Sequence, residues 1–248
     1  MHRFYIPPAE WQGGALRLTG SEAHHARNVL RMQPGDKAVL FNGRGREVTA
    51  EVTAVGAREI ELRKLHEAAT PPLRCRITLG QAIPKGKNMD LIVQKAVEIR
   101  AAEIVPIISD RTIVRLGADD AAQKQSKWQT VAIEAAKQCG QNWLPDVATP
   151  RTMAQFFSER PCFDLQLIGS LQSDAFHLKK ILAEHVAEHG DRPASVLMLI
   201  GPEGDFTPAE LNLARSSGCR PITLGPVILR VETAAIYCLS VLSYELLA

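Results

Sequence analysis

Two glycine-proline loops near the C-terminus, each following a short apolar run, constrain the fold more than any other feature of this chain. The loop 201–204 (Gly-Pro-Glu-Gly) follows the apolar run 196–200, and the loop 225–234 follows 222–224. Apolar runs of this length that end at glycine and proline are typical of buried strands. Since ligands bind beyond the carboxyl ends of the strands in open α/β sheets, we expect the two loops to form a binding site.

A helix is well marked between the two loops. Thr207 can act as its N-cap, Pro208 suits the first helical position, and Glu210 completes a capping box. The same alternation of strand and helix occurs upstream: we expect strands at 76–82, 103–108 and 164–168, and helices through 89–97, 121–138 and 178–186. This alternation predicts an α/β fold with a largely parallel sheet, covered on both faces.

The N-terminal part of the chain has a different pattern. Residues 37–65 alternate between apolar and polar, with turns at Asn42–Gly45 and Gly56. Asn42-Gly43 is a type I′ turn signal, and short strands at this spacing predict a small antiparallel β-barrel. The small-residue and proline stretch 68–72 fits a linker. We therefore expect two domains, at 1–70 and 73–248.

Composition argues against several classes of protein. With 46% hydrophobic and 23% charged residues among 248, the chain is typical of a folded globular protein. No apolar stretch is long enough for a membrane helix and no signal-peptide core is present, so we expect a cytoplasmic protein. The five cysteines form no Cys-x-x-Cys pair, which favours reduced thiols and no metal site. Motifs of common hydrolases and nucleotide triphosphatases are missing from the sequence.

Arg230 and Glu232 interrupt the apolar stretch of the second loop. Burying either charge alone costs several kcal/mol. Two alternatives remain open: the two side chains form an ion pair, with Glu232 favouring the N-terminus of the helix expected at 234–247, or they face a cleft. Glu203 poses a similar choice between a turn carboxylate and a ligand contact.

Two further patterns concern partners. The helix expected at 234–247 is apolar on nearly every side, which predicts burial against a second subunit. Basic side chains gather in two places, His24-His25 on a short expected helix and the lysines between 85 and 95. The two histidines fit a solvated helix face, and because adjacent residues point in different directions on a helix, they are not expected to bind one metal. The lysines either form a solvated helix face or meet phosphate. A net charge of +2 is too small to indicate a nucleic-acid binder by itself.

Four motifs together resemble one family. The segments Leu199–Gly204, Leu224–Ala234, Lys85–Met89 and His24–Arg31 are similar to those of the bacterial 16S ribosomal RNA uracil-N3 methyltransferases, of the SPOUT class. The resemblance covers essentially the whole chain. It implies a PUA-like RNA-binding barrel and an α/β domain whose C-terminal segment forms a trefoil knot. It also implies a homodimer that binds S-adenosylmethionine between the knotted loops and acts on 16S ribosomal RNA in the small ribosomal subunit.

The resemblance also implies roles for particular residues. Arg230 would stabilise charge on the uracil oxygens, with Glu232 or Glu203 orienting it or acting as base. The residues implied to bind the cofactor are Leu199, Ile200, Gly201, Gly204, Leu224, Gly225, Ile228, Leu229 and Thr233. Those implied to bind RNA are His24, His25, Arg27, Arg31, Lys85, Lys87 and Lys95.

The chain departs from the family pattern at two places. Asp205 stands where relatives commonly have glycine, and it either caps the following helix or places a carboxylate near the cofactor. Gln141 stands where relatives often have arginine, which weakens a phosphate-binding role for that loop. Because of Asp205, a non-catalytic RNA-binding or ribosome-assembly protein on the same fold remains the alternative.

Overall fold

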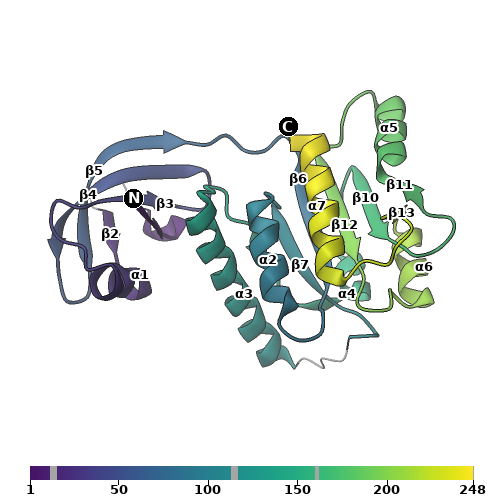
Figure 1. Cartoon of the computed structure of the whole chain (residues 1–248), viewed down its shortest axis with the longest axis horizontal. Helices are drawn as coiled ribbons and strands as arrows, with labels where there is room; N and C mark the ends of the chain where they lie inside the picture. Colours follow the sequence, from purple (N-terminus) through teal and green to yellow (C-terminus); the bar gives the residue numbers. More distant parts are fainter. Residues whose placement is uncertain (12–15, 113–116, 160–161, 248) are drawn as a thin grey trace. The chain divides into compact units, whose positions relative to one another are not determined.

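The computed structural model describes residues 1–11, 16–112, 117–159 and 162–247, which form two compact units (Figure 1). The first unit consists of Met1–Pro72 and Ile133–Leu144, and the second of Leu73–Ala132 and Pro145–Ala248. Helix α3 (Ala118–Cys139) contributes residues to both units. The sequence did not indicate that residues 133–144 would join the first unit.

The first unit is built on a five-stranded sheet with the order β1-β3-β4-β5-β2. Its elements are β1 (His2–Tyr5), the 3-10 turn η1 (Pro8–Glu10), β2 (Leu16–Leu18), α1 (Gly20–His24), the π-helical turn η2 (His25–Val29), β3 (Lys37–Phe41), β4 (Arg46–Val55) and β5 (Ile60–Ala69). The expected hairpins β3-β4 and β4-β5 are present and antiparallel. The strand β1 pairs with β3 in parallel, which the long connection between them permits.

The turn between β3 and β4 differs from the type I′ turn that Asn42-Gly43 predicts. Such a turn needs a positive φ at both residues, and Gly43 has one (69°) whereas Asn42 does not. Instead, the buried Asn42 side chain accepts hydrogen bonds from the backbone N–H groups of Arg44 and Arg46. The side chain therefore holds a wider loop, and the type I′ prediction was wrong.

The linker expected at 68–72 is shorter than predicted. Ala68 and Ala69 belong to β5 and pair with Glu47 and Arg46 of β4. Strand pairing uses backbone groups, so small side chains at the end of a long hairpin do not prevent it. The irregular connection begins at Thr70.

Residues 140–144 clasp the β3-β4 turn within the first unit. Gly45 N–H donates to the carbonyl oxygen of Asn142 (2.9 Å), and Leu144 N–H donates to that of Gly43 (3.0 Å). Nearby, the largely buried Lys137 forms ion pairs with Glu22 (3.0 Å) and Glu134 (2.9 Å). The end of α3 and the segment after it are thus structural parts of the first unit.

The second unit contains an eight-stranded sheet in which neighbouring strands run parallel, in the order β11-β13-β10-β12-β6-β7-β8 with β9 also beside β7. Its strands are β6 (Arg76–Ala82), β7 (Glu103–Ile108), β8 (Asp146–Val147), β9 (Arg151–Thr152), β10 (Leu165–Gly169), β11 (Phe176–His177), β12 (Ser195–Ile200) and β13 (Arg220–Thr223). Its other helices are α2 (Asn88–Glu98), α4 (Met153–Ser158), α5 (Leu178–His189), α6 (Pro208–Ser216) and α7 (Val231–Leu247). The predicted parallel α/β fold is confirmed.

Helices cover both faces of this sheet. Residues 196–200 of β12 are all buried, although side chains alternate between the two faces of a strand. On one face, Leu197 and Leu199 share a core with Phe156 of α4 and Leu211 of α6. The helix α7 packs against β6, β12 and α2. It begins at Val231, three residues before the expected start, so Glu232 lies in its first turn.

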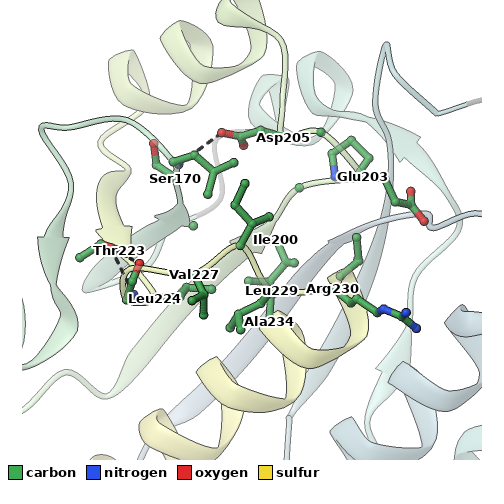
Figure 2. Close-up of a pocket in the computed structure, with 18 of the residues that line it drawn as sticks. Ser170, Ile200, Glu203, Asp205, Thr223, Leu224, Val227, Leu229, Arg230 and Ala234 are labelled. Atoms are coloured by element: carbon green, nitrogen blue, oxygen red, sulfur yellow. Dashed lines mark hydrogen bonds between the residues drawn. The ribbon is translucent and has the colours of Figure 1, made fainter.

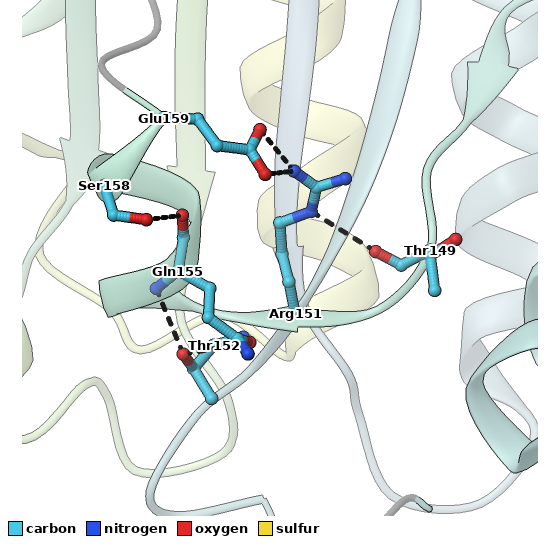
Figure 3. A network of polar contacts seen from close by, with 6 residues as sticks. All are labelled: Thr149, Arg151, Thr152, Gln155, Ser158 and Glu159. Atoms are coloured by element: carbon cyan, nitrogen blue, oxygen red, sulfur yellow. Dashed lines mark hydrogen bonds and ion pairs between the residues drawn. The ribbon is translucent and has the colours of Figure 1, made fainter. Parts of the chain in front are cut away.

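Two helices begin with a capping box. Thr207 and Glu210 form the predicted one at the start of α6. Thr152 and Gln155 form another at α4, where Figure 3 also shows Arg151 paired with Glu159 at 2.6 Å. These reciprocal bonds satisfy backbone N–H groups that the first turn of a helix leaves unpaired.

The cysteines agree with the expectation of reduced thiols. All five are free, and three of them are buried. Burial raises the pKa of the Cys75, Cys219 and Cys238 thiols to about 12. None of the helices described is long and apolar enough to cross a membrane.

His185 of α5 makes the stability of the second unit sensitive to acid. Its ring is buried and stacks on that of His189, with the ring centroids 4.3 Å apart. Burial, together with His189, lowers the pKa of His185 below its usual 6.5. The unfolded chain therefore takes up the proton first, so this stability is complete above pH 6.5 and is lost as the pH falls through the folded-state pKa.

We expect the melting temperature of the wild type to fall more between pH ~8 and ~5 than that of His185→Leu, which has no proton to bind there. Thermal melts followed by circular dichroism at both pH values measure the difference. Equal falls for the two proteins would contradict this role of His185.

Candidate functional site

A cavity of about 580 Å³ lies at the carboxyl edge of the second sheet. Its walls are the loops that follow three neighbouring strands, β13, β10 and β12. The lining residues are 169–172 after β10, 200–205 at the end of β12, 223–231 after β13, and Ala234 of α7. This volume lies within the range of about 300–1,000 Å³ that small-molecule sites occupy.

Most residues implied to bind a cofactor line this cavity. Ile200, Gly201, Gly204, Leu224, Gly225, Ile228 and Leu229 do so. Leu199 does not, because it is fully buried in the core beside α4 and α6. Thr233 is exposed on α7 and also lies outside the lining. The two glycine-proline loops therefore meet, as their position after parallel strands predicts.

Two positions of the loops require glycine, for different reasons. Gly225 lines the cavity and has a φ of 113°, a conformation that side chains rarely adopt, although a Cβ built on it would have no atom within 4 Å. A Cβ on Gly201 would lie 3.2 Å from the Phe206 ring and 3.3 Å from Asp205 Oδ1. Larger side chains at these positions would strain the backbone or crowd the loop.

The charged residues of the two loops are arranged differently from the predicted ion pair. Arg230 and Glu232 form neither a hydrogen bond nor an ion pair with each other; the Arg230 side chain is exposed at the edge of the cavity. Glu232 is half-buried, does not line the cavity, and accepts a hydrogen bond from Asn88 Nδ2 at 3.2 Å. Glu203 lines the cavity and accepts from the backbone N–H of Lys85 at 3.2 Å.

Figure 2 shows the guanidinium of Arg230 and the carboxylate of Glu203 at the same side of the cavity, opposite Ser170 and Thr223. Both side chains, Arg230 and Glu203, are exposed. A negatively charged or polar substrate that approaches this side therefore meets a cation without a partner among the described residues. The alternative in which Arg230 faces a cleft is the one that the geometry supports.

Large apolar side chains of the second loop are also exposed. Val227 and Ile228 line the cavity, yet 65% and 80% of their surfaces are accessible. Tyr237 and Tyr244 of α7 are 49% and 76% accessible. A loop and a helix that present apolar surface beside a cavity are typical of an interaction site.

Asp205 does not cap α6, so that alternative was wrong. The capping residue is Thr207, whose hydroxyl accepts from the backbone N–H of Glu210. The Asp205 carboxylate lines the cavity instead. Its φ of 72° is a left-handed conformation, which glycine adopts more readily.

The loop 169–172 was missed as a wall of the cavity. Gly169 ends the strand β10, which pairs with both β12 and β13, and Ser170 follows it. The strand was predicted, but its place between the other two depends on pairing that sequence periodicity does not reveal. The glycine that ends this strand was the available signal.

The residues implied to bind RNA fall in both units. In the first, His24 and Arg31 are exposed, the His25 ring packs edge-on against Phe4, and Arg27 donates to the carbonyl oxygens of Gly56 and Ala57. In the second, the exposed Lys85 and Lys87 stand next to Asn88. Lys95 instead pairs with Glu98 at 2.8 Å.

The segment 85–88 is tied to both glycine-proline loops, through Glu203 and through Glu232. Lys85 and Lys87 therefore lie at the edge of the sheet where the cavity opens. In the ranges that the structure describes, no group of three or more His, Cys, Asp or Glu side chains could hold a metal ion.

The second unit and part of the first match known family models. Residues 71–243 match an RNA methyltransferase domain, and residues 18–65 match an RNA methyltransferase PUA domain. The chain is 30% identical to ribosomal RNA small subunit methyltransferase E of Bacillus subtilis over 99% of its length and 97% of that protein.

Solved structures with bound cofactor are also similar. Ribosomal RNA small subunit methyltransferase E from Neisseria gonorrhoeae, bound to S-adenosylmethionine, has a TM-score of 0.85 and 33% identity, with 99% of this chain and 98% of that one covered. A Legionella pneumophila protein in complex with S-adenosylmethionine has a TM-score of 0.86 and 33% identity, with 98% and 97% covered.

Proposed function

Because the chain belongs to the RNA methyltransferase family that includes ribosomal RNA small subunit methyltransferase E, we propose that it transfers a methyl group from S-adenosylmethionine to N3 of a uridine in 16S ribosomal RNA. One observation carries this proposal. The two glycine-proline loops line one cavity, and the exposed Arg230 lies at its edge.

The cavity fits the cofactor in size and in lining. Its volume of about 580 Å³ suits a nucleoside-sized ligand, and Gly201, Gly204 and Gly225 are among its lining residues. We assign the cofactor to the loops 200–204 and 224–229. S-adenosylmethionine supplies the methyl group, activated on a sulfonium that leaves as a neutral thioether.

The residues at the edge of the cavity perform the rest of the chemistry. Uracil N3–H is a weakly acidic imide, so its proton must leave before N3 attacks the methyl carbon. We assign this proton to Glu203, which lines the cavity, and the stabilisation of negative charge on the uracil oxygens to Arg230. The N3–C bond then forms as the C–S bond breaks, and the bonding pair stays on sulfur. Glu232, held by Asn88, is assigned a positioning role.

The target uridine must be unpaired or flipped out, because N3 lies on the Watson–Crick edge of the base. We propose that Lys85 and Lys87 contact phosphates near the cavity, and that His24, His25, Arg27 and Arg31 form a second RNA contact on the PUA-like unit. The substrate, ribosomal RNA in the small subunit, implies a cytoplasmic location.

The C-terminal segment is proposed to form the trefoil knot of the SPOUT class. In the sheet, β10 separates β13 from β12 and β6. The helix α7, which follows β13 in the chain, nevertheless packs on β12, β6 and α2. The chain after β13 must therefore return across two strands. This path supports the knot and brings both glycine-proline loops to one cavity.

A homodimer is proposed for the exposed apolar surface described above. Tyr237 and Tyr244 are seven residues apart and lie on one side of α7, the helix that follows the loop carrying Val227 and Ile228. A second copy of the chain that covers this surface would also complete the cavity edge. The protein is therefore expected to sediment as a dimer.

The substitution Tyr244→Arg places a charge in this surface, and desolvating it would cost several kcal/mol. We expect the variant to sediment as a monomer at micromolar concentration and to bind the cofactor more weakly. Leu65→Arg, an exposed apolar residue of the first unit (44% accessible), is the control and should remain a dimer. A monomeric wild type would refute the dimer.

Two experiments test the function itself. Calorimetry measures whether S-adenosylmethionine binds; no heat at millimolar cofactor would exclude the enzyme. Mass-spectrometric mapping of methylated uridines in 16S RNA, after the gene is deleted and restored, identifies the product. Restoration with Arg230→Ala is the control, and a non-catalytic RNA-binding protein would leave the RNA unchanged in all strains.

A further inference from the structure

Asp205 adopts a backbone conformation that L-residues rarely take. Its φ is 72°, in the left-handed region, where a Cβ approaches the carbonyl oxygen and costs about 1 kcal/mol. Aspartate tolerates this region when its short side chain bonds nearby backbone groups. An outlier of this kind at the wall of a cavity raises the question of what holds it there.

The polar groups of Asp205 are all engaged. Its Oδ1 accepts from the backbone N–H of Phe206 at 2.8 Å, and its Oδ2 accepts from that of Leu171 at 3.4 Å. Its own N–H donates to the carbonyl oxygen of Pro202 at 3.0 Å. Arg111 donates to the carbonyl oxygens of Asp205 and Gly204.

The bond to Leu171 connects two walls of the cavity. In the loop after β10, Ser170 N–H donates to the carbonyl oxygen of Ile222 at 3.0 Å, and Gln172 N–H donates to Ser170 Oγ at 3.2 Å. The N–H between them, that of Leu171, donates to Asp205. Figure 2 shows this bond joining Asp205 to the loop beside Ser170.

The side chain of Leu171 does not anchor its loop, since 59% of its surface is accessible. The loop after β10 therefore meets the loop after β12 through the Asp205 carboxylate and not through the side chain of Leu171. At 3.4 Å this tie is long for an N–H···O bond, so it fixes position with little rigidity.

We infer that Asp205 is a positioning residue that joins these two loops and sets the width of the cavity. It acts on cofactor binding and leaves the chemical step to the residues at the cavity edge. The identity of the ligand rests on the proposed function; the tie itself rests on the contacts of Asp205.

Three variants of the full chain separate the tie from the backbone strain. Asp205→Ala loses the acceptor and keeps the strain, Asp205→Gly loses the acceptor and relieves the strain, and Asp205→Asn keeps an acceptor and tolerates the left-handed conformation. Each is measured for S-adenosylmethionine affinity by calorimetry, for KM and kcat, and for melting temperature.

We expect Asp205→Ala and Asp205→Gly to bind S-adenosylmethionine about tenfold more weakly, the equivalent of one hydrogen bond, with kcat at saturating cofactor close to that of the wild type. Asp205→Gly should melt at or above the wild-type temperature, so that weaker binding cannot be ascribed to unfolding. Asp205→Asn should restore wild-type affinity within about threefold.

Wild-type affinity in the glycine variant would overturn the inference and leave the methyltransferase function intact. Failure of asparagine to restore binding would also overturn it, because a charge effect would then be at work. If the wild type itself bound no cofactor, the proposed function would fail, and amide exchange at Leu171 would still test the tie: exchange should be faster in Asp205→Gly, and unchanged exchange would refute it.

Discussion

Arg230→Ala should reduce methyl transfer to 16S RNA by at least roughly 100-fold while changing the affinity for S-adenosylmethionine by less than about tenfold. The guanidinium is exposed at the cavity edge and makes no ion pair with Glu232. It is therefore available to meet charge that develops on the substrate, and it contributes little to holding the cofactor. Single-turnover rates with saturating enzyme and calorimetry with the cofactor measure the two quantities separately.

Two controls narrow the interpretation of this result. Arg230→Lys keeps the charge but loses the planar fork of donors, so we expect an intermediate rate. Arg74→Ala removes an exposed arginine two residues before β6, at the strand end opposite the cavity, and should leave the rate unchanged. Turnover of Arg230→Ala at the wild-type rate would remove Arg230 from the chemistry.

Glu210→Ala should destabilise the second unit by about 3 kcal/mol, because it removes an acceptor that three donors share, among them the buried Ser109 hydroxyl. The Glu210 side chain is 7% accessible, and its carboxylate accepts from Ser109 Oγ, Asp110 N–H and Thr207 N–H, all within 3.0 Å. It therefore joins the end of β7 to the start of α6. For a chain of this length, the loss corresponds to a fall in melting temperature of about 6–12 °C.

Glu210→Gln retains a residue that suits a capping box but loses one acceptor, so less than half of the effect is expected. Glu159→Ala removes an exposed carboxylate, 64% accessible, from its pair with Arg151. That change should cost at most about 1 kcal/mol. If Glu210→Ala and Glu159→Ala had the same melting temperature, the hydrogen bonds of Glu210 would contribute nothing to stability.

Local patterns predicted the elements of this fold well. Alternation in period two predicted the antiparallel hairpins β3-β4 and β4-β5, and the apolar runs between glycine and proline predicted the parallel α/β sheet, because burial imposes these periods directly on the sequence. The parallel pairing of β1 with β3 was not part of the antiparallel barrel that the pattern predicted. The turn at Asn42 was wrong for a reason visible only in three dimensions. Its side chain is buried and accepts hydrogen bonds from the backbone N–H groups of Arg44 and Arg46. These bonds outweigh the propensity of Asn-Gly for a tight turn.

The candidate site was predictable in part. The glycine-proline loops meet because both follow parallel strands, which the sequence indicated. The wall formed by 169–172 and the connection of Asp205 to Leu171 depend on the order of the strands, which is set by contacts between distant segments. Leu199 belongs to the buried core because a strand with both faces covered leaves few side chains at the cavity. The knot was implied by family resemblance alone.

The segment 133–144 has a consequence for how the protein is made. This segment bonds to Gly43 and Gly45 and carries Lys137, which pairs with Glu22. It belongs to the first unit, whose other residues are all within Met1–Pro72. During synthesis this unit cannot be completed until the ribosome has translated beyond Leu144, by which time part of the second sheet has already emerged. The N-terminal strands must wait for more than half of the chain, in contrast to the usual order in which an N-terminal domain folds first.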